Sequence, residues 1–217
     1  MQTIERAHGL VLRTRPLTET SLIVNWLTLE FGRISTIAKG ARRTKSPFRG
    51  KLDLFYEAEF SLQRSQRSEL HTLREVVLHE TNEALRRELG YLQQAAYCSA
   101  LIEQSTERET PLPVVFELMR GFLRALPLTP PLPQTIFGFE LKLLEELGLQ
   151  PDLETSKMTP GSKLIAKALR EKDWASTVRL KSSEAQVSEL RQFLHGFLIF
   201  HLGKIPSGRN KALMPLQ

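Results

Sequence analysis

A dense run of cationic side chains is the feature of this sequence with the clearest chemical meaning. Between Gly32 and Leu52 the chain carries no acidic residue and seven cationic ones, namely Arg33, Lys39, Arg42, Arg43, Lys45, Arg49 and Lys51. Charges of one sign at this density repel one another, so we expect a partner outside the fold to compensate them. The most common such partner is a phosphate backbone, and the run therefore favours nucleic-acid binding. A solvated surface loop, or a guard against aggregation on an edge strand, would leave the same pattern.

Aromatic residues interleave with this run and offer a second kind of contact. They are Trp26, Phe31, Phe48, Phe55 and Tyr56. Cationic side chains contact phosphates without reading the base sequence, whereas aromatic rings can stack on unpaired bases. Most aromatic side chains of a small β-domain belong to its core, so we expect only one or two to be exposed, with Phe48 first.

A weaker basic segment lies near the end of the chain, in HLGKIPSGRNKAL. Its cations are Lys204, Arg209 and Lys211, and they predict a secondary basic site. The alternative is that these cations follow a helix, where the helix dipole favours positive charge.

The remaining reactive residue types form no catalytic or metal-binding pattern. The single cysteine, Cys98, lies in the apolar stretch AAYCSAL and is expected to be a buried core residue. No two of the five histidines have the spacing of HExxH, and we expect His195 and His201 to be hydrogen-bonded core residues. The sequence contains no GxGxxG, P-loop or GxSxG motif. We therefore expect no enzyme activity, metal, cofactor or small-molecule substrate.

The first 75 residues have the pattern of short β-strands. Phe55 to Gln63 alternates, with Tyr56, Ala58, Phe60 and Leu62 on the side expected to be buried. Four further segments are rich in apolar and β-branched residues and are separated by turn signals: 8–15, 21–29, 33–38 and 69–77. Five short strands predict a small barrel, with an OB-like barrel first and an SH3-like barrel as the alternative.

From about Thr81 onward the hydrophobic period becomes helical. Three apolar stripes are expected to be buried: Leu85, Leu89, Leu92 and Ala96; Val115, Met119, Phe122 and Leu126; and Phe137, Leu141 and Leu144, with Glu140, Glu145 and Glu146 left outside. Gly148 predicts a helix end, Thr159-Pro160 a helix start, and Ser183 with Gln186 a capping box. The last helix has a broad apolar face that is expected to be core: Val187, Leu190, Phe193, Leu194, Phe197, Leu198, His201 and Leu202.

These patterns predict a two-part α+β protein, with a five-stranded OB-fold barrel at 1–78 and an all-helical domain at 79–217. Its charge is uneven: residues 1–75 carry a net charge of +5, residues 76–154 one of −6 and residues 155–217 one of +7. This distribution indicates separate functional surfaces. The N-terminal residues lack the apolar core of a signal peptide, and no apolar stretch is long enough to span a membrane. We therefore expect a soluble, cytoplasmic protein without membrane contacts.

Several motifs resemble the RecO family of bacterial recombination mediators. They are the Arg-Pro-x-x-Glu-Thr-Ser run at 15–21, the segment 28–32, the AKGAR element at 38–42, Ser46, and Leu-x-x-Phe at 52–55. The later FELKLLEELGLQPDL and the closing HLGKIPSGRNKAL are similar to RecO segments as well. The resemblance covers most of the chain, and is strongest in the first 75 residues.

The resemblance implies an OB-fold followed by a helical domain that binds single- and double-stranded DNA and anneals complementary strands. It also implies contacts with RecR and with the C-terminal tail of single-strand binding protein, in order to load RecA, and association with the nucleoid. By match to the motif, DNA backbone contacts would fall on Lys39, Arg42, Arg43 and Lys45, with Arg13, Arg15, Arg33, Arg49 and Lys51 beside them.

The chain departs from the family's pattern in two places. Many RecO proteins carry four zinc-binding cysteines after the segment that matches 148–153, whereas this chain reads LETSKMTPGSK there, so we expect no zinc site. The stretch between that point and the last helix is also short. A non-catalytic scaffold that binds an acidic protein tail through its basic surface, with DNA binding incidental, is the alternative function.

Overall fold

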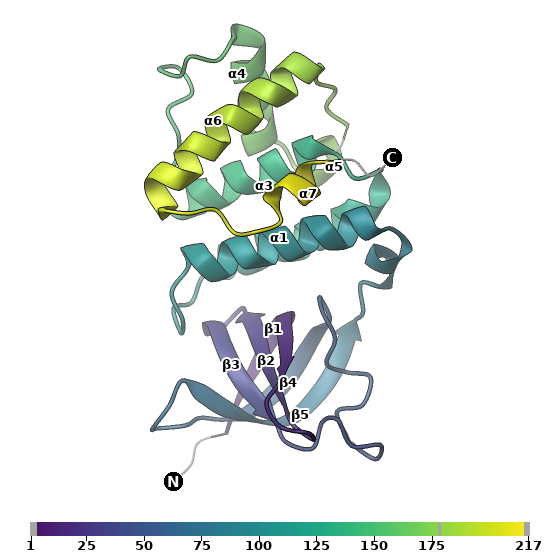
Figure 1. Cartoon of the computed structure of the whole chain (residues 1–217). Coiled ribbons are helices and arrows are strands. Elements are labelled where there is room, and N and C mark those ends of the chain that lie inside the picture. The colour runs from purple at the N-terminus through teal and green to yellow at the C-terminus, as the bar shows by residue number, and fades with distance from the viewer. Residues whose placement is uncertain (1–3, 178, 215–217) are drawn as a thin grey trace. The chain divides into compact units, whose positions relative to one another are not determined.

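The computed structural model describes residues 4–177 and 179–214 and divides the chain into two compact units (Figure 1). The first unit contains the residues up to 82 together with 106–117, and the second contains 83–105 together with the residues from 118 onward. The segment 106–117 returns to the first unit, so a single boundary near residue 78 does not represent this division.

The first unit is built on a closed barrel of five strands. They are β1 (Ile4–Pro16), β2 (Leu22–Thr28), β3 (Gly32–Ala38), β4 (Glu57–Gln63) and β5 (Leu70–Glu80), hydrogen-bonded in the order β1-β2-β3-β5-β4. All neighbouring strands are antiparallel except β3 and β5, which are parallel from Ser35 and Leu70 to Ile37 and Thr72. The prediction of a five-stranded OB-fold barrel is confirmed.

Alternating apolar residues fill the barrel, as the sequence pattern requires. Trp26 stacks on Phe60 with 4.2 Å between ring centroids, and its indole N–H donates to Thr36 Oγ1 at 2.9 Å. The predicted inner face of β4 is confirmed at Ala58, Phe60 and Leu62. Glu57, expected on the solvent side, is buried instead. It can be buried because His8 Nε2 lies 2.9 Å from its carboxylate.

The loop between β3 and β4, residues 39–56, carries most of the cationic run. It is a chain of tight turns, in which Arg43 N donates to Gly40 O, Ser46 N to Arg43 O, and Arg49 N to Ser46 O. Phe48 lies in the hydrophobic core of the barrel and is buried, so the prediction that it is the first exposed aromatic residue is wrong. The ring holds the loop against the barrel, because the polar turns around it bury little apolar surface of their own.

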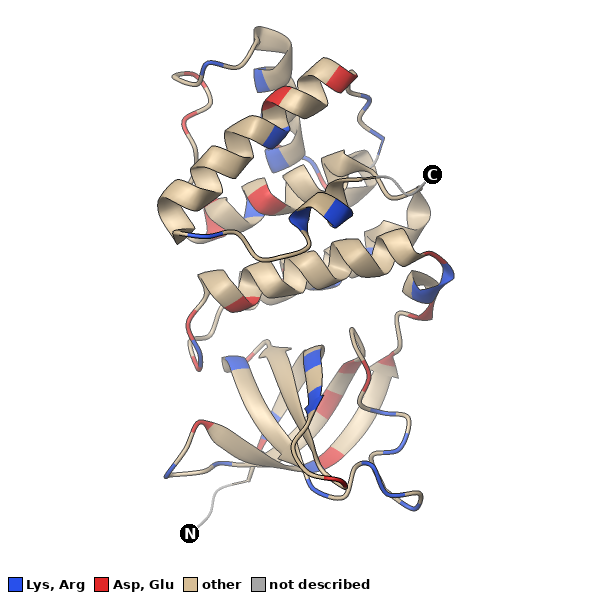
Figure 2. Ribbon diagram, viewed as in Figure 1, with Lys and Arg blue, Asp and Glu red and all other residues tan. Residues whose placement is uncertain are grey.

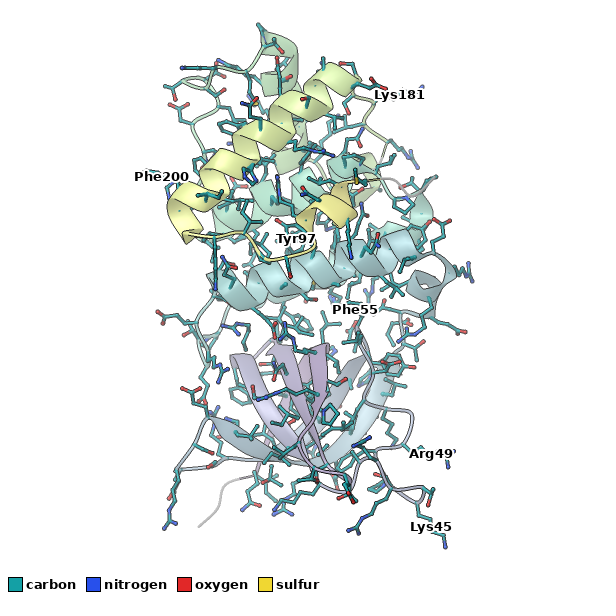
Figure 3. The ribbon with its side chains drawn as sticks, viewed as in Figure 1. Lys45, Arg49, Phe55, Tyr97, Lys181 and Phe200 are labelled. Carbon is teal, nitrogen blue, oxygen red and sulfur yellow. The ribbon has the colours of Figure 1, made fainter. Side chains whose placement is uncertain are left out.

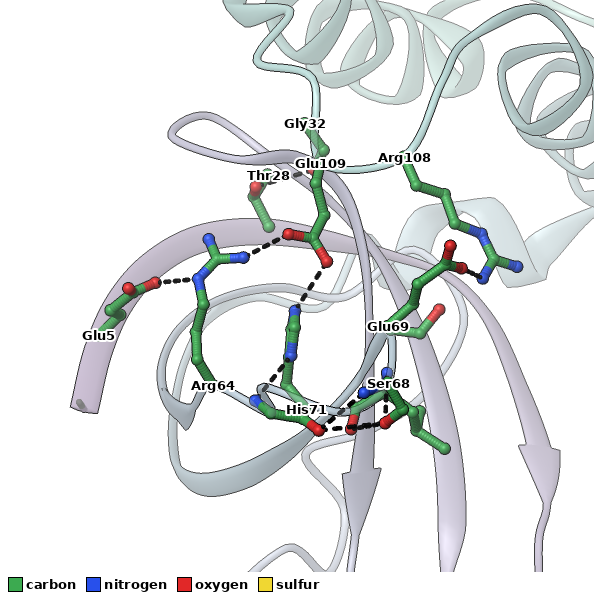
Figure 4. A network of polar contacts seen from close by, with 12 residues as sticks. Glu5, Thr28, Gly32, Arg64, Ser68, Glu69, His71, Arg108 and Glu109 are labelled. Carbon is green, nitrogen blue, oxygen red and sulfur yellow. Dashed lines mark hydrogen bonds and ion pairs between the residues drawn. The ribbon is translucent and has the colours of Figure 1, made fainter. Parts of the chain in front are cut away.

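The segment 106–110, which we call the clamp segment, is bound to the opposite end of β3 (Figure 4). The Glu109 carboxylate contacts Arg64 Nη1 at 2.5 Å and His71 Nε2 at 3.2 Å, and Glu109 N donates to Arg33 O at 2.9 Å. The Arg33 guanidinium donates to Thr106 Oγ1 at 2.7 Å.

The clamp segment also explains the glycine at the start of β3. A Cβ on Gly32, whose φ is +65°, would lie 1.8 Å from the carbonyl oxygen of Thr110, so only glycine fits there.

The helical part of the chain follows the barrel. Its elements are η1 (Glu83–Arg87), α1 (Leu89–Ser105), α2 (Pro113–Ala125), η2 (Leu126–Leu128), α3 (Pro133–Glu146), α4 (Pro160–Glu171), α5 (Trp174–Thr177), α6 (Glu184–Leu202) and α7 (Arg209–Leu213). Thr159 caps α4, and Ser183 with Gln186 forms the predicted capping box of α6. Gly148, with φ of +70°, follows the end of α3. These predicted helix boundaries are confirmed. None of the helices in the described ranges is long and apolar enough to cross a lipid bilayer.

Two of the three predicted apolar stripes are confirmed. Val115, Met119, Phe122 and Leu126 are buried, and so are Phe137, Leu141 and Leu144. The first stripe is wrong, because Leu89 is 59% exposed and Ala96 is also exposed. Leu85 is buried but belongs to the separate 3₁₀ turn η1, so its helical phase does not continue into α1. The buried side of α1 is instead formed by Tyr91, Ala95, Cys98 and Ile102, among others.

A buried ion pair joins α3 to α7. Arg209 Nε and Nη2 donate to the two carboxylate oxygens of Glu140 at 2.6 and 2.8 Å, and Tyr97 Oη donates to Glu140 Oε1 at 2.6 Å. All three side chains are buried. Two predictions are therefore wrong: Glu140 does not face solvent, and Arg209 is not part of a basic surface. Burial and the adjacent Glu140 carboxylate raise the pKa of Tyr97 well above its usual value, so it stays a hydrogen-bond donor.

Only a narrow side of α6 is core. Leu190, Leu194 and Leu198 are buried, whereas Phe193 and Phe197 are half-buried. His195 and His201 are exposed, so the prediction of core histidines is wrong. The broad apolar face expected from the sequence is thus wider than the surface that α6 buries in its own unit.

Removing Arg209 is predicted to destabilise the helical unit. Arg209→Ala leaves the Glu140 carboxylate buried without its bidentate partner, a change that costs about 3–5 kcal/mol of unfolding free energy. Urea denaturation followed by helical circular dichroism measures this, with Lys211→Ala, an exposed site two residues away, as the control. Equal stability of the two variants would contradict the structural role of the pair.

Truncating Phe48 is predicted to release the loop 39–56. Phe48→Ala removes a buried ring, at a cost of about 3–5 kcal/mol, and should make the Lys and Arg residues of the loop accessible to trypsin. Limited trypsin digestion followed by mass spectrometry detects this, with Leu54→Ala, a partly exposed site in the same loop, as the control. Cleavage of both variants at the rate of the original chain would show that Phe48 does not anchor the loop.

Candidate nucleic-acid interface

Most of the predicted DNA-binding cations lie on the surface of the barrel unit. Exposed side chains are those of Arg13, Arg15, Lys39, Arg42, Arg43, Lys45 and Arg49. Figure 2 shows Lys and Arg following the loop 39–56, and Figure 3 shows Lys45 and Arg49 projecting from it. Asp53 is the first acidic residue along the chain after this run. The loop therefore presents several cations in a short stretch of chain.

The turn between β1 and β2, residues 17–21, is hydrogen-bonded to the start of this loop. Arg42 N donates to Thr20 O at 3.0 Å, and Arg42 Nη1 donates to Thr18 O at 3.2 Å. The turn is itself closed by Thr18 Oγ1, which accepts from Ser21 N at 3.1 Å. These bonds fix the backbone at Arg42, and with it the direction of the neighbouring Arg43.

A surface hollow of about 380 Å³ lies where the turn and the loop meet. Its lining includes the hydroxyl-bearing residues Thr18, Thr20 and Ser21 from the turn, and Lys39 and Arg43 from the loop. Hydroxyl groups and cationic side chains are the groups that proteins use to bind phosphate oxygens. The charge run alone did not predict the contribution of 17–21, although the Arg-Pro-x-x-Glu-Thr-Ser motif covers that turn.

Two predicted contacts are engaged elsewhere in the unit. Arg33 donates to Thr106 Oγ1 and binds the clamp segment, and it lies on β3 before the strand reaches the loop. Lys51 Nζ donates to Val76 O at 3.2 Å and is partly buried. Both cations are partly buried as well as bonded to protein acceptors, so we leave them out of the candidate interface.

The barrel aromatics add no clear stacking surface. Trp26, Phe48 and Phe55 are buried, and Tyr56 packs partly against the core. The Arg64 guanidinium covers the ring of Phe31, with Arg64 Cζ 4.8 Å from the centroid of that ring. The chemistry that the barrel interface offers is therefore phosphate binding rather than base stacking.

Two of the three cations predicted for the secondary basic site are on the surface. Lys204 and Lys211 are exposed, while Arg209 is paired with Glu140 inside the helical unit. Within the described ranges no three histidine, cysteine, aspartate or glutamate side chains are placed to hold a metal ion. Burial, helped by the charge of Glu140, raises the pKa of the Cys98 thiol well above its usual value, which disfavours the reactive thiolate.

Comparisons with known proteins agree with these features. The family model described as Recombination protein O N terminal matches residues 1–82, and the one described as Recombination protein O C terminal matches 86–157. DNA repair protein RecO of Bacillus pumilus (strain SAFR-032) is 33% identical over 149 residues, which is 69% of this chain and 57% of the relative. The protein of the same name from Anaeromyxobacter sp. (strain K) is 34% identical over 146 residues, covering 67% of this chain and 58% of the relative.

A third relative, DNA repair protein RecO of Bacillus subtilis (strain 168), is 31% identical over 150 residues, covering 69% of this chain and 58% of the relative. The chain thus aligns with less than two thirds of the length of these curated relatives. The family matches cover the barrel, where the motifs at 15–21 and 38–42 lie, and the helical region to residue 157, where FELKLLEELGLQPDL lies. The similar segment HLGKIPSGRNKAL lies beyond them. This chain belongs to the RecO family.

Proposed function

We propose that this chain is a DNA-binding recombination mediator, which anneals complementary single strands during DNA repair. The observation that carries the proposal is the group of exposed cations at residues 39–49 of the loop, a stretch without an acidic residue, which is hydrogen-bonded to the 17–21 turn of an OB barrel. Family membership supports a role in DNA repair and recombination. We further propose that the chain acts without catalysis, in the cytoplasm and at the nucleoid.

The annealing mechanism follows from phosphate neutralisation. Two complementary strands repel each other through their phosphates, and cations placed between or beside them reduce that repulsion. Arg42 and Arg43 are adjacent in sequence, and one of them is fixed by backbone and side-chain bonds to the turn. If about five phosphates are neutralised, log K for single strands should fall with log salt at a slope of about −3.5.

The protein partners are proposed from the family and from a groove in the helical unit. We propose that the chain contacts RecR and single-strand binding protein. These contacts would load RecA onto DNA that is coated with single-strand binding protein. A groove of about 710 Å³ is lined by Lys163, Lys167 and Arg170 of α4 around the exposed Leu164, and by the preceding loop, which includes Asp152 and Glu154. Cations around an apolar side chain suit an acidic peptide with apolar residues.

Charge reversal in the loop is predicted to slow annealing strongly. Arg42→Glu/Arg43→Glu replaces two phosphate contacts with repulsion, and should slow annealing of oligonucleotides coated with single-strand binding protein by at least about tenfold. The plot of log K against log salt for single strands should also become shallower, its slope decreasing in magnitude by about 1.4. Annealing is measured by the loss of fluorescence from a donor and quencher pair on the two strands.

The control for this experiment is Arg86→Glu/Arg87→Glu, which makes the same change of net charge at two adjacent exposed residues of η1. It should anneal like the original chain if position, and not overall charge, decides the activity. Equal annealing by the loop variant and the original chain would disprove the assignment of DNA binding to this loop.

The groove is predicted to bind an acidic tail independently of DNA. Lys167→Glu combined with Leu164→Ala should weaken binding of a peptide from the C-terminal tail of single-strand binding protein by at least about tenfold, while the loop variant Arg42→Glu/Arg43→Glu should keep it. Isothermal titration calorimetry measures both. If the loop variant loses the peptide and the groove variant keeps it, the acidic tail binds the basic loop, as the alternative scaffold function requires.

A further inference from the structure

The second half of α6 carries a row of aromatic rings that its own unit buries only in part. Phe193, Phe197 and His201 follow one another at intervals of four residues, with ring centroids 6.0 and 4.3 Å apart. Phe200 packs against the edge of His201 at 4.9 Å. Phe200 is 82% exposed and projects from the helix in Figure 3. We call these four residues the aromatic row.

The aromatic row is additional to what α6 needs for folding. The helix is held by Leu190, Leu194 and Leu198, which are buried, and by its capping box. The aromatic row lies on the flank of that narrow core side. A single exposed ring needs no explanation, whereas four rings packed in sequence along one flank form a patch of the kind that marks a binding site.

The end of α6 and the chain that follows it carry cations but no carboxylate along the sequence. From Leu190 to the end of the sequence there is no Asp or Glu, while four Lys and Arg residues occur: Arg191, Lys204, Arg209 and Lys211. Arg209 is used inside the unit, but Lys204 and Lys211 are exposed. The last acidic residue of α6, Glu189, accepts hydrogen bonds from Thr159 N and Oγ1 at 3.1 and 2.8 Å.

We propose that this surface is a second binding site for single-stranded DNA, in which unpaired bases stack on the aromatic row and a phosphate contacts the exposed Lys204, three residues after His201. Aromatic rings beside cations are the combination by which proteins hold unpaired bases without reading their sequence. A lipid surface or a second copy of the chain would need only apolar area, whereas this surface is a series of aromatic rings, which favours unpaired bases over both. The proposal shares with the proposed function the premise that the ligand is DNA, but it uses none of the loop residues.

The two sites divide the chemistry of strand binding between them. The barrel loop offers phosphate contacts with its aromatics buried, whereas the α6 surface offers rings that a base can reach only when it is unpaired. The α6 surface should therefore prefer single strands to duplex, and release them once they are paired.

The test is fluorescence anisotropy with a labelled oligothymidylate, using the full chain and its Arg42→Glu/Arg43→Glu variant as two backgrounds. Phe200→Leu keeps an apolar side chain and removes the ring, and should weaken single-strand binding by about tenfold in both backgrounds. Phe200→Trp should retain the affinity. Binding to a duplex of equal length should not change, and Ile199→Ala, at a neighbouring position 43% exposed, should behave like the original residue.

The outcomes separate this proposal from the proposed function. If the loop variant binds DNA normally and Phe200→Leu does not, the loop assignment fails while the α6 site stands. Unchanged single-strand binding by Phe200→Leu in both backgrounds would overturn the α6 site, whatever the loop variant does. If Phe200→Leu keeps its single-strand binding but no longer binds phosphatidylglycerol vesicles, the surface binds lipid. If it keeps single-strand binding but loses a dimer that the original chain forms in sedimentation equilibrium, the surface binds a second copy of the chain.

Discussion

Closure of the barrel through the parallel pairing of β3 with β5 is the constraint on which the candidate interface depends. Because β5 lies between β3 and β4, these two consecutive strands cannot be joined by a tight hairpin, and the chain must cross from one to the other through the long loop 39–56. The cations of the sequence lie on this crossing. The same closure removes free strand edges, so the basic residues are not needed as guards against edge pairing.

A loop of this length and charge needs anchors, because its cations repel one another and its turns bury little surface. Phe48 supplies an apolar anchor in the barrel core, and Arg42 supplies a polar one through Thr18 and Thr20. Lys39, Arg43, Lys45 and Arg49 are exposed to solvent. A polyanion bound there would relieve the repulsion that the loop keeps in its free form, so binding and loop stability are expected to reinforce each other.

The helical unit uses charge in the opposite way. Glu140 and Arg209 neutralise each other inside the unit, with Tyr97 satisfying a carboxylate oxygen, and the pair ties the short helix α7 to α3. A cation that looked like part of a basic tail is thereby removed from the surface, while the aromatic rings of α6, which looked like core, remain on it. Breaking such a pair costs more than forming it gains, so it acts mainly to specify one arrangement of these helices.

The sequence by itself determined the elements that depend on local pattern: the five strands, the period of α2 and α3, the caps at Thr159 and Ser183, and the cationic run with its family motifs. It could not determine which partner each side chain meets. Glu140 and Arg209 are buried against each other, and Glu57 is buried beside His8, although these partners are far apart in the sequence. Arg33 and Lys51 also meet protein acceptors from distant parts of the chain. Periodicity also overestimated the core, at Leu89 and along α6, because it reports which side of a helix is apolar, and only tertiary packing decides how much of that side is covered.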